Sequence, residues 1–513
     1  MFSVLLFDPK LSTGGDDAVY LILGRALATG KGYSEINLPG SPPHTLYPFG
    51  LPLVLALVHL VAGSASVIVS KVVVVIFGLL ALFFAYRVFE QVLHEYAPLA
   101  GALFVSLPVL YEHSHHVFTE VPFLCLSMAA VWLLADVEKA GPEQVAAGFA
   151  CAVGALALRS AGIALAVAIL AYLLVRRWFL YAGMFGLLAG VFLLAWSIRN
   201  ASVGAGSGYL EQFLARNPYV KEAGQIGLAD FLVRIGHNLK VYTLVATPRT
   251  VVALLAGGSG RTVVGLALAG LGVVGLLVRL RRPSVVEFYA VPGGVVLLSW
   301  PQVWASPRFL LPLVPLVLVY VCLGACWLAQ RVRLSGAVPV VLVLVAGSNL
   351  IALGRQSVSA VRDNIGFLRG DRLAGYPDDW RRYFDCIDWI GHNTAADAVV
   401  LARKPEYVYL VSGRRSFCFP FSADESEVLV ALMRSDYVLI DNFRWAGTTA
   451  AVLGPVLESH PEEYELVYRS APPEAYVLRM KRGRLGFRGN ASRWLSRVMP
   501  AWTKNARAAE SKS

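Results

Sequence analysis

Two adjacent carboxylates near the start of the chain are the residues best suited to chemistry. Asp16 and Asp17 stand in a polar loop, after Gly14 and Gly15, just before an apolar run. One carboxylate of such a pair can act as a general base that takes a proton from a hydroxyl or amine, while its neighbour orients it or binds a cation. The same residues also make a good helix start, because Asp caps exposed backbone N–H groups. From the pair alone, both interpretations stay open.

Glu120 is a second candidate, because it follows a histidine-rich stretch and opens an apolar run. The stretch 111–119 contains His113, His115 and His116. An ionisable residue at the mouth of a transmembrane helix is a functional candidate, since burying its charge there is costly. The histidines also raise a possible divalent metal site, but they match no established ligand spacing. The other interpretation is a hydrated loop between two helices.

Three arginines stand at the ends of apolar runs. Arg159 separates two such runs, Arg199 ends one, and Arg308 precedes another. A guanidinium group offers a planar fork of donors that suits phosphate, so the three are candidates for binding an anionic substrate. The alternative is that they extend toward lipid headgroups.

Several familiar kinds of site are missing from the sequence. It has no P-loop, no GxGxxG, no HExxH and no Ser-His-Asp signature, and its cysteines do not have zinc-site spacing. Cys386 and Cys418 lie in the polar C-terminal region, where a disulfide between them is compatible with the sequence. The other cysteines lie in or beside apolar segments and are expected to act as small hydrophobic residues: Cys125, Cys151, Cys322 and Cys326.

The elements that must position these residues are apolar helices. Of the 513 residues, 57% are hydrophobic and 15% charged, whereas a soluble globular chain carries about 25% charged residues. We therefore expect a mainly α, polytopic transmembrane helical bundle with about ten spans. The runs are 66–89, 97–111, 121–136, 145–158, 160–175, 180–198, 262–280, 285–300, 309–329 and 336–353.

The distribution of positive charge predicts an orientation. The net charge is +11, and clusters beside apolar spans indicate membrane topology instead of nucleic-acid binding. Basic turns at Arg176-Arg177, Arg279–Arg282 and Arg331–Arg333 are expected in the cytoplasm. Counting spans from them places the segments 112–120, 199–261, 301–308 and everything after 354 on the opposite side.

The side on which the acidic pair lies depends on the short apolar run 51–62. If this run crosses the membrane, Asp16 and Asp17 face the cytoplasm. If it lies in the interface or re-enters, they share the outer side with Glu120, Arg199 and Arg308. Its shortness and its flanking prolines favour the second arrangement.

A change of composition near residue 371 predicts a second domain. We expect a membrane domain over 1–370 with external loops 1–65, 112–120 and 199–261, then a small extracytoplasmic α/β domain over 371–485 and a basic, disordered tail over 486–513. The expected strands are Ala398–Ala402, Tyr437–Asp441, Tyr464–Arg469 and Tyr476–Met480, and the expected helices are 378–391, 424–434 and 448–458.

The order of several short motifs along residues 14–330 resembles a known superfamily. The motifs are Asp16-Asp17 with Tyr20, Ala26, Gly30, Pro42-Pro43 and Tyr47-Pro48; Thr119-Glu120; Leu158-Arg159 with Gly162; Trp196 to Asn200; and Arg308-Phe309 with Leu311-Pro312 and Pro315. This set resembles the GT-C glycosyltransferases, and within them the bacterial members of the protein O-mannosyltransferase and lipid A aminoarabinose transferase group.

The resemblance implies an activity and roles for the candidate residues. It implies a polyprenyl-phosphate-linked sugar donor, an inverting displacement at the anomeric carbon, and a multi-pass protein of the plasma (inner) membrane. Its active site would lie on the outer surface, and the acceptor would be a lipid, a glycan or a protein. Asp16 would be the base, supported by Asp17 and Glu120. The substrate-binding residues would be Tyr20, Arg159, Arg199 and Arg308. The resemblance assigns no cofactor, and the possible divalent metal rests on the histidine-rich stretch alone.

Two further features follow from the resemblance. Relatives carry a transmembrane helix before the acidic pair, whereas only fifteen residues precede Asp16 here, so the first family helix is expected to be missing. The C-terminal domain resembles external domains that contribute to acceptor binding or assembly.

Two other classes of protein remain as alternatives. A transporter or flippase for a lipid-linked or anionic substrate would also use outward-facing arginines, but it should carry more polar residues within its spans than this chain has. The other alternative is a non-catalytic scaffold that displays the C-terminal domain.

Overall fold

The chain folds into two compact units, each of which is discontinuous in sequence. A computed structural model describes residues 1–63, 65–203, 208–255 and 260–481. The helical unit consists of Met1–Pro9, Thr45–Arg216 and Gln225–Ile365, and the sheet unit of Lys10–His44, Asn217–Gly224 and the chain from Gly366 onward. Each unit has its own hydrophobic core. The expected tail over 486–513 lies outside the described residues.

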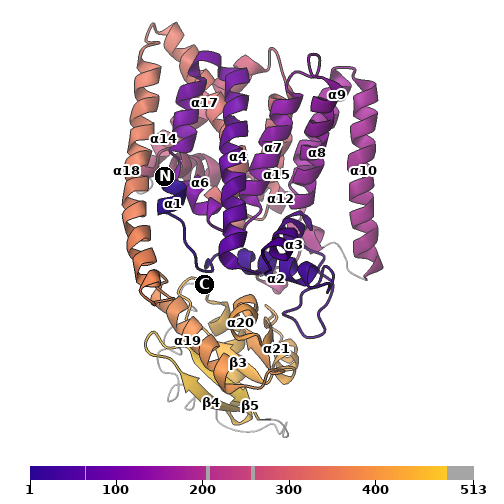
Figure 1. Cartoon of the computed structure of the whole chain (residues 1–513), viewed down its shortest axis with the longest axis vertical. Coiled ribbons are helices and arrows are strands. Elements are labelled where there is room, and N and C mark those ends of the chain that lie inside the picture. Colours follow the sequence, from indigo (N-terminus) through magenta and orange to yellow (C-terminus); the bar gives the residue numbers. More distant parts are fainter. Residues whose placement is uncertain (64, 204–207, 256–259, 482–513) are drawn as a thin grey trace. The chain divides into compact units, whose positions relative to one another are not determined.

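The helical unit is a bundle of apolar helices (Figure 1). Its elements are α1 (Phe2–Leu5), α3 (Gly50–Ala62), α4 (Val67–Leu93), η1 (His94–Tyr96), α5 (Ala97–Val105), α6 (Pro108–Ser114), α7 (Glu120–Leu134), α8 (Pro142–Leu158), α9 (Gly162–Val175), α10 (Phe179–Ser202), α11 (Gly208–Leu214), α12 (Leu228–Val241), η3 (Tyr242–Ala246), α13 (Thr247–Val251), η4 (Ala253–Leu255), α14 (Gly260–Arg279), α15 (Val285–Ser299), η5 (Gln302–Trp304), α16 (Pro307–Leu310), η6 (Leu311–Leu313), α17 (Val314–Arg331) and α18 (Ala337–Leu368).

The predicted polytopic helical fold is confirmed. Five helical segments are long and apolar enough to cross a membrane: Val67–Val105, Phe179–Ser202, Gly260–Arg279, Pro307–Arg331 and Ala337–Leu368. Shorter apolar helices complete the bundle: Gly50–Ala62, Glu120–Leu134, Pro142–Leu158, Gly162–Val175 and Val285–Ser299.

One expected span has a different form in the structure. The run 97–111 is divided between α5 and α6, because Pro108 cannot continue the helix that ends at Val105 and instead occupies the first turn of the next. The nine residues of α5 rise only about 14 Å.

Close backbone contact fixes the pairing of α14 with α17. A side-chain carbon placed on Gly275 would overlap the carbonyl oxygen of Tyr320, and one placed on Gly324 would overlap that of Leu271. In a membrane, small residues of this kind let helices approach closely, so that van der Waals packing holds them together.

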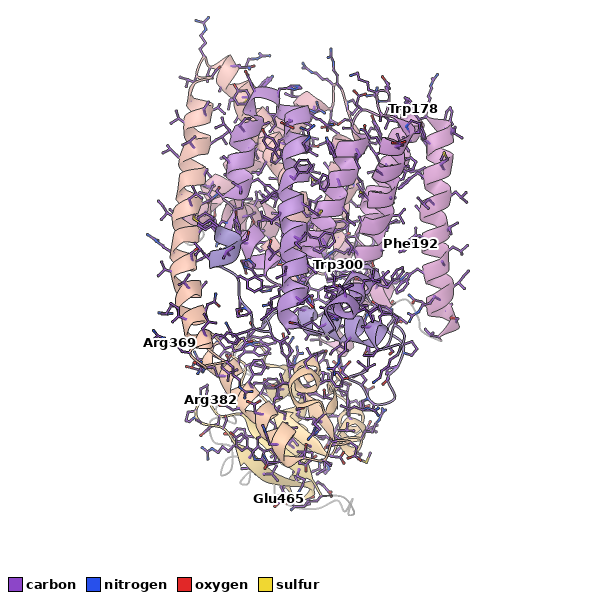
Figure 2. The ribbon with its side chains drawn as sticks, viewed as in Figure 1. Trp178, Phe192, Trp300, Arg369, Arg382 and Glu465 are labelled. Atoms are coloured by element: carbon purple, nitrogen blue, oxygen red, sulfur yellow. The ribbon has the colours of Figure 1, made fainter. Side chains whose placement is uncertain are left out.

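The bundle separates the basic turns from the candidate arginines. Neighbouring helices such as α7, α8, α9 and α10 pack side by side and alternate in direction. Trp178, which follows the Arg176-Arg177 turn, lies at one end of the bundle, and Trp300 lies toward the other end (Figure 2). Arg176 also donates to the carbonyl of Pro283 at 3.2 Å, so two of the basic turns are neighbours.

The sheet unit contains one helix from near the start of the chain and the entire C-terminal α/β fold. Its elements are α2 (Asp16–Ala28), η2 (Lys221–Ala223), α19 (Asp378–Asn393), β1 (Val399–Ala402), α20 (Pro405–Ser412), β2 (Arg415–Phe417), α21 (Glu425–Met433), β3 (Tyr437–Ile440), η7 (Thr449–Leu453), α22 (Gly454–Ser459), η8 (Pro461–Glu463), β4 (Tyr464–Arg469) and β5 (Tyr476–Met480).

The sheet has five strands in the order β2-β1-β3-β5-β4. β1 pairs in parallel with β2 and β3, while β5 runs antiparallel to both β3 and β4. Because side chains alternate along a strand, Leu401 faces a core made with α21 and α22, whereas Val400 and Ala402 face a core made with α19 and α20. Ala18 of α2 joins the second core.

Two features of the sheet unit differ from the sequence expectations. The strand β2 and the helix α20 were not expected, because β2 has only three residues and its buried position is Ser416, which carries no apolar signal. The backbone N–H of Ser416 donates to Asn37 at 2.8 Å. The structure also has no Cys386–Cys418 disulfide, since both residues are free thiols.

The glycine contact between α14 and α17 can be tested by replacing a glycine with a larger residue. Gly275→Leu should force the two backbones apart, with a cost of about 1–3 kcal/mol for overpacking, and lower the thermal unfolding temperature of the protein in detergent. Gly270→Leu on the same helix is the matched control, because no atom lies within 4 Å of a side-chain carbon placed there. Equal unfolding temperatures for the two variants would contradict this packing.

Candidate functional site

Three of the predicted site residues form one charged cluster in the helical unit. Glu120 Oε1 lies 2.6 Å from Arg159 Nη1 and 2.6 Å from Arg308 Nε. The Glu120 side chain is fully buried, whereas those of Arg159 and Arg308 are 16% and 20% exposed. Two positive charges therefore converge on one negative charge.

The ends of several helices position this cluster. Glu120 is the first residue of α7, where a carboxylate is stabilised by the helix dipole. Arg159 follows the last residue of α8, and Arg308 belongs to the short helix α16. The Arg308 guanidinium carbon lies 3.9 Å from the ring centroid of Phe118, which fixes its orientation from one side.

The geometry changes what Glu120 is suited to do. Glu120 Oε1 accepts from both guanidinium groups, so its lone pairs are occupied, whereas Oε2 is buried and has no hydrogen-bond partner among the described residues. Two adjacent positive charges also favour the ionised carboxylate, so Glu120 is a poor acceptor for a substrate proton. Its contacts are those of a residue that holds two arginines in place. The two guanidinium groups are partly exposed, and their planar forks of donors are suited to binding an anion.

The histidine-rich stretch serves packing in the structure. His115 Nε2 lies 3.1 Å from the carbonyl oxygen of Ser3, and its ring packs against Phe7. His116 packs against Phe118, the ring that supports Arg308.

The residues near Glu120 do not fit the possible divalent metal. A metal ion there would face the two guanidinium groups, which already hold the carboxylate. Across the described chain, no group of three or more His, Cys, Asp or Glu side chains is placed to hold a metal ion.

The acidic pair lies in the sheet unit, and its two members have different surroundings. Asp17 is fully buried, and its Oδ2 accepts from both the backbone N–H (3.1 Å) and the hydroxyl of Ser12. The Tyr407 hydroxyl lies 3.4 Å from Asp17 Oδ1 and donates to the Ser12 carbonyl oxygen. Burial, together with the Asp17 charge, raises the pKa of Tyr407 well above its usual range, so the hydroxyl keeps its proton. Asp17 thereby fastens the start of α2 to α20.

Asp16 is only partly buried and lies beside other charges. Burial raises the pKa of the Glu406 carboxyl, and the charges of Asp16 and Glu35 raise it further while Lys404 opposes them. Lys404 Nζ lies 2.6 Å from where a side chain on Gly15 would begin, and Gly15 has a φ of 94°, in the region that favours glycine. Of the pair, Asp16 is the one that a substrate could reach.

The other two candidates have separate surroundings. Tyr20 is a buried residue of α2 in the sheet unit. Arg199 lies near the end of α10 in the helical unit, where its Nη1 donates to Asn200 Oδ1 at 2.9 Å and its guanidinium lies over Trp196. The structure thus brings Glu120, Arg159 and Arg308 together.

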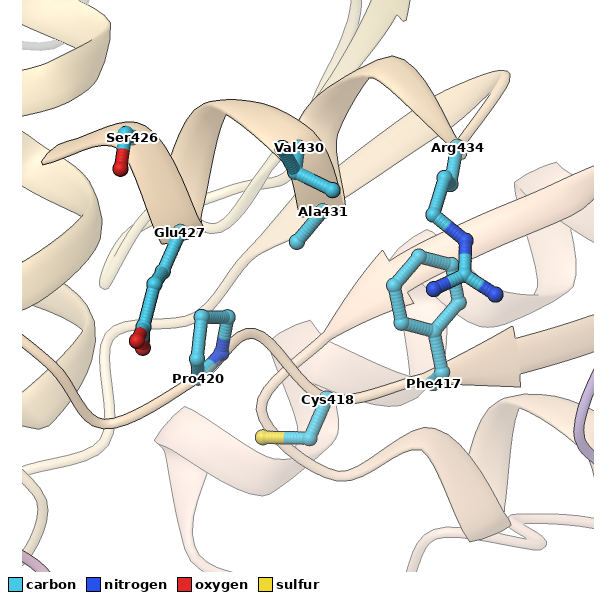
Figure 3. A pocket seen from close by; sticks show the side chains of 8 residues that line it. All are labelled: Phe417, Cys418, Pro420, Ser426, Glu427, Val430, Ala431 and Arg434. Atoms are coloured by element: carbon cyan, nitrogen blue, oxygen red, sulfur yellow. The ribbon is translucent and has the colours of Figure 1, made fainter. Parts of the chain in front are cut away.

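A shallow hollow of about 430 Å³ lies between β2 and α21 (Figure 3). Its lining is mostly apolar, with Glu427 and Arg434 at different points of its rim. None of the residues predicted to act in the site lines it.

Sequence reasoning missed several residues around these clusters. Thr119, whose hydroxyl accepts from Arg159 at 3.2 Å, directly precedes Glu120 and belongs to the same motif. Phe309 neighbours Arg308 in the chain and lies under Arg159. By contrast, nothing local in the sequence connects Tyr407 with Asp17, because 390 positions separate them.

Comparisons with known proteins agree with the polytopic helical fold. Residues 47–198 match a family described as dolichyl-phosphate-mannose-protein mannosyltransferase. No curated protein sequence matches the chain.

Among solved structures, ArnT from Cupriavidus metallidurans bound to undecaprenyl phosphate has a TM-score of 0.55 at 12% identity, over 95% of this chain and 97% of that one. ArnT in the apo state has a TM-score of 0.53 at 13% identity, over 93% and 95%. The Archaeoglobus fulgidus oligosaccharyltransferase, tethered with an acceptor peptide containing the NVT sequon, has a TM-score of 0.53 at 13% identity, over 94% and 73%. At these identities the structures show a shared fold.

The charged cluster predicts that loss of the Glu120 carboxylate lowers the stability of the protein. Glu120→Gln should leave the two arginines without a counter-charge, and breaking a buried pair in this way costs up to about 3–5 kcal/mol. We expect a lower thermal unfolding temperature in detergent, measured by differential scanning fluorimetry. Glu112→Gln is the matched control, since Glu112 is exposed on α6. An unchanged unfolding temperature for Glu120→Gln would show that the ion pairs carry no net stabilisation.

Proposed function

We propose that the chain is a membrane glycosyltransferase of the GT-C type, which its match to a mannosyltransferase family over residues 47–198 and its fold support. In this proposal it transfers a sugar from a polyprenyl-phosphate-linked donor to an extracytoplasmic lipid, glycan or protein acceptor. Two observations on related structures support the choice of substrates: one ArnT structure is bound to undecaprenyl phosphate, and the archaeal oligosaccharyltransferase is tethered to an acceptor peptide.

The convergence of Arg159 and Arg308 on buried Glu120 is the observation that carries the proposal. We assign the donor phosphate to these two arginines, with Glu120 as the residue that positions them. Arg199 at the end of α10 is a further candidate for the same anion. Positive charge held in place before the reaction stabilises the charge that grows on a leaving phosphate without a reorganisation cost.

We assign the general base to Asp16. Its partial exposure supports this choice, and the buried contacts of Asp17 with Ser12 and Tyr407 support a structural part for the neighbour. In the proposed step, an acceptor oxygen or nitrogen attacks the anomeric carbon and gives its proton to Asp16. The bond between that carbon and the phosphate oxygen breaks, and polyprenyl phosphate leaves with the electron pair. Attack opposite the leaving group inverts the anomeric configuration.

The direction of the helices supports an extracytoplasmic site. Arg159 precedes α9, whereas the basic pair Arg176-Arg177 follows it. Likewise, Arg308 comes before α17, whereas Arg331 and Arg333 stand at its far end. Since basic turns favour the cytoplasm, the arginine cluster belongs to the outer side of the plasma membrane.

Substitution of the proposed base tests the function. Asp16→Asn should lower the transfer rate by about 10²–10⁴-fold, because an amide cannot accept the acceptor's proton. The measurement is transfer of label from radiolabelled polyprenyl-phosphate sugars in isolated membranes that contain equal amounts of each variant.

Asp136→Asn is the control for this test, because Asp136 is an exposed carboxylate paired with Lys139 in a turn of the helical unit.

Arg308→Lys should raise the KM for the donor more than it lowers kcat, since a point charge replaces a planar fork. Full turnover of Asp16→Asn would remove Asp16 from the mechanism, and an unchanged KM in Arg308→Lys would remove that arginine from the donor site.

A further inference from the structure

The strand order of the sheet unit marks a place where α/β folds bind ligands. In open α/β sheets, ligands bind outside the carboxyl ends of parallel strands, at the point where the connections leave in opposite directions. Here the chain passes from β1 to β2 on one side of β1, then returns to β3 on the other side. The intervening helices α20 and α21 cover opposite faces of the sheet. The switch point therefore lies between β1 and β3.

Cations and an aromatic ring meet at the carboxyl ends of these two strands. Arg403 and Lys404 directly follow β1, and the loop 441–448 follows β3. Lys404 Nζ lies 5.2 Å and the Arg403 guanidinium carbon 5.8 Å from the ring centroid of Trp445. Arg403 Nε also donates to Thr448 Oγ1 at 2.8 Å, which ties the two loops together. We call Arg403, Lys404 and Trp445 the switch-point cluster.

The charges of the switch-point cluster are not neutralised by ion pairs. In the part of the chain that the structure describes, neither Arg403 nor Lys404 has a carboxylate within 4.0 Å of its charged nitrogens. The nearby Asp441 is buried and accepts from the Thr449 hydroxyl at 2.6 Å, so its carboxylate is already engaged. Two cations held without a paired carboxylate indicate an anionic ligand.

The aromatic ring of Trp445 narrows the chemical class of the ligand further. Trp445 is 52% exposed, although it is a large apolar side chain, and its ring is stacked with that of Phe443 at 5.2 Å between centroids. An exposed indole presents a flat apolar face and one N–H donor, which suits a ligand that combines an apolar face with polar groups. A sugar ring has this combination.

We propose that the switch-point cluster binds an acidic carbohydrate, that is, a sugar that carries a carboxylate or a phosphate. The sugar ring lies against Trp445, and its anionic group is held by Arg403 and Lys404. The cluster is separate from the shallow hollow beside α21.

The position of Lys404 connects this ligand with the proposed reaction. Lys404 Nζ packs against the backbone of Gly15, which directly precedes Asp16. An acidic sugar at the cluster is therefore bound near the residue assigned as the base, and it is the acceptor of the transfer. This last identification rests on the proposed function, whereas the binding of the sugar does not.

Binding to the purified full-length protein in detergent tests the proposal. The probes are glucuronic acid, glucose 6-phosphate, glucose and inorganic phosphate, with glucuronosyl diacylglycerol in the micelles as a lipid-linked form. Saturation-transfer NMR gives the dissociation constants. We expect both acidic sugars to bind about tenfold or more tightly than glucose, as loss of a charge-assisted contact predicts.

Variants of the cluster make the test specific. Lys404→Ala and Trp445→Ala should each weaken binding of the acidic sugars by about tenfold, and Lys404→Arg should restore it. Arg479→Gln is the matched control, because Arg479 is exposed, pairs with Glu465 and lies opposite the first residue of β3, at the other end of that strand. Gel filtration and far-UV circular dichroism establish that each variant is folded.

The outcomes separate the inference from the proposed function. If free glucuronate binds more tightly than the lipid-linked form, the ligand is a soluble sugar, and if the lipid-linked form binds more tightly, the ligand is a glycolipid. Either result supports the site. The proposal is overturned if glucose binds as tightly as glucuronate, if no probe binds, or if inorganic phosphate binds as tightly as glucose 6-phosphate. Asp16→Asn should keep the binding. If Asp16→Asn still transfers sugar, the assignment of the base fails while the binding result stands.

Discussion

The buried carboxylate of Glu120 is the charge on which the arrangement of the helical unit depends. Apolar helices in a lipid environment gain little from hydrophobic burial against each other, so polar contacts and close packing must decide which faces meet. Glu120 supplies such a contact between the start of α7, the end of α8 and the segment before α17. Its charge also requires the two arginines, because a lone ion there would be very costly. The proposed anion binding and the assembly of the helices thus share the same three side chains.

In the sheet unit, hydrogen bonds instead of ion pairs determine which elements meet. Asp17 and the Tyr407 hydroxyl hold the start of α2 against α20, while Ile22 and Ala26 pack beside Tyr409 and Leu410. Because this network engages one carboxylate of the pair completely, it leaves the other at a fixed position on a rigid helix end. Fixed positions of this kind are what a reactive group needs.

The sequence was sufficient for elements whose signal is local. The apolar spans, the strand β3 and the helix α19 could be predicted from runs and periodicity, and Glu120, Arg159 and Arg308 could be chosen for their place at the ends of spans. The convergence of these three residues could not be predicted, since Glu120 and Arg308 are 188 positions apart. The switch-point cluster was missed for a related reason. It depends on strand order, which is set by the pairing of β1 with both β2 and β3, and β2 has almost no apolar signal.

The division of the sheet unit along the chain has a consequence for biosynthesis. Residues 10–44 leave the ribosome before the helical segments 45–365, but the strands and helices that hold them come only after Gly366. At about 5–20 residues per second, the intervening helical segments take roughly 15–65 s to make. During that interval Asp17 has neither Tyr407 nor the core around Ala18 to bind. The acidic loop therefore acquires its folded form only when the last strands are complete, so an incompletely synthesised chain carries its carboxylates on an unstructured segment.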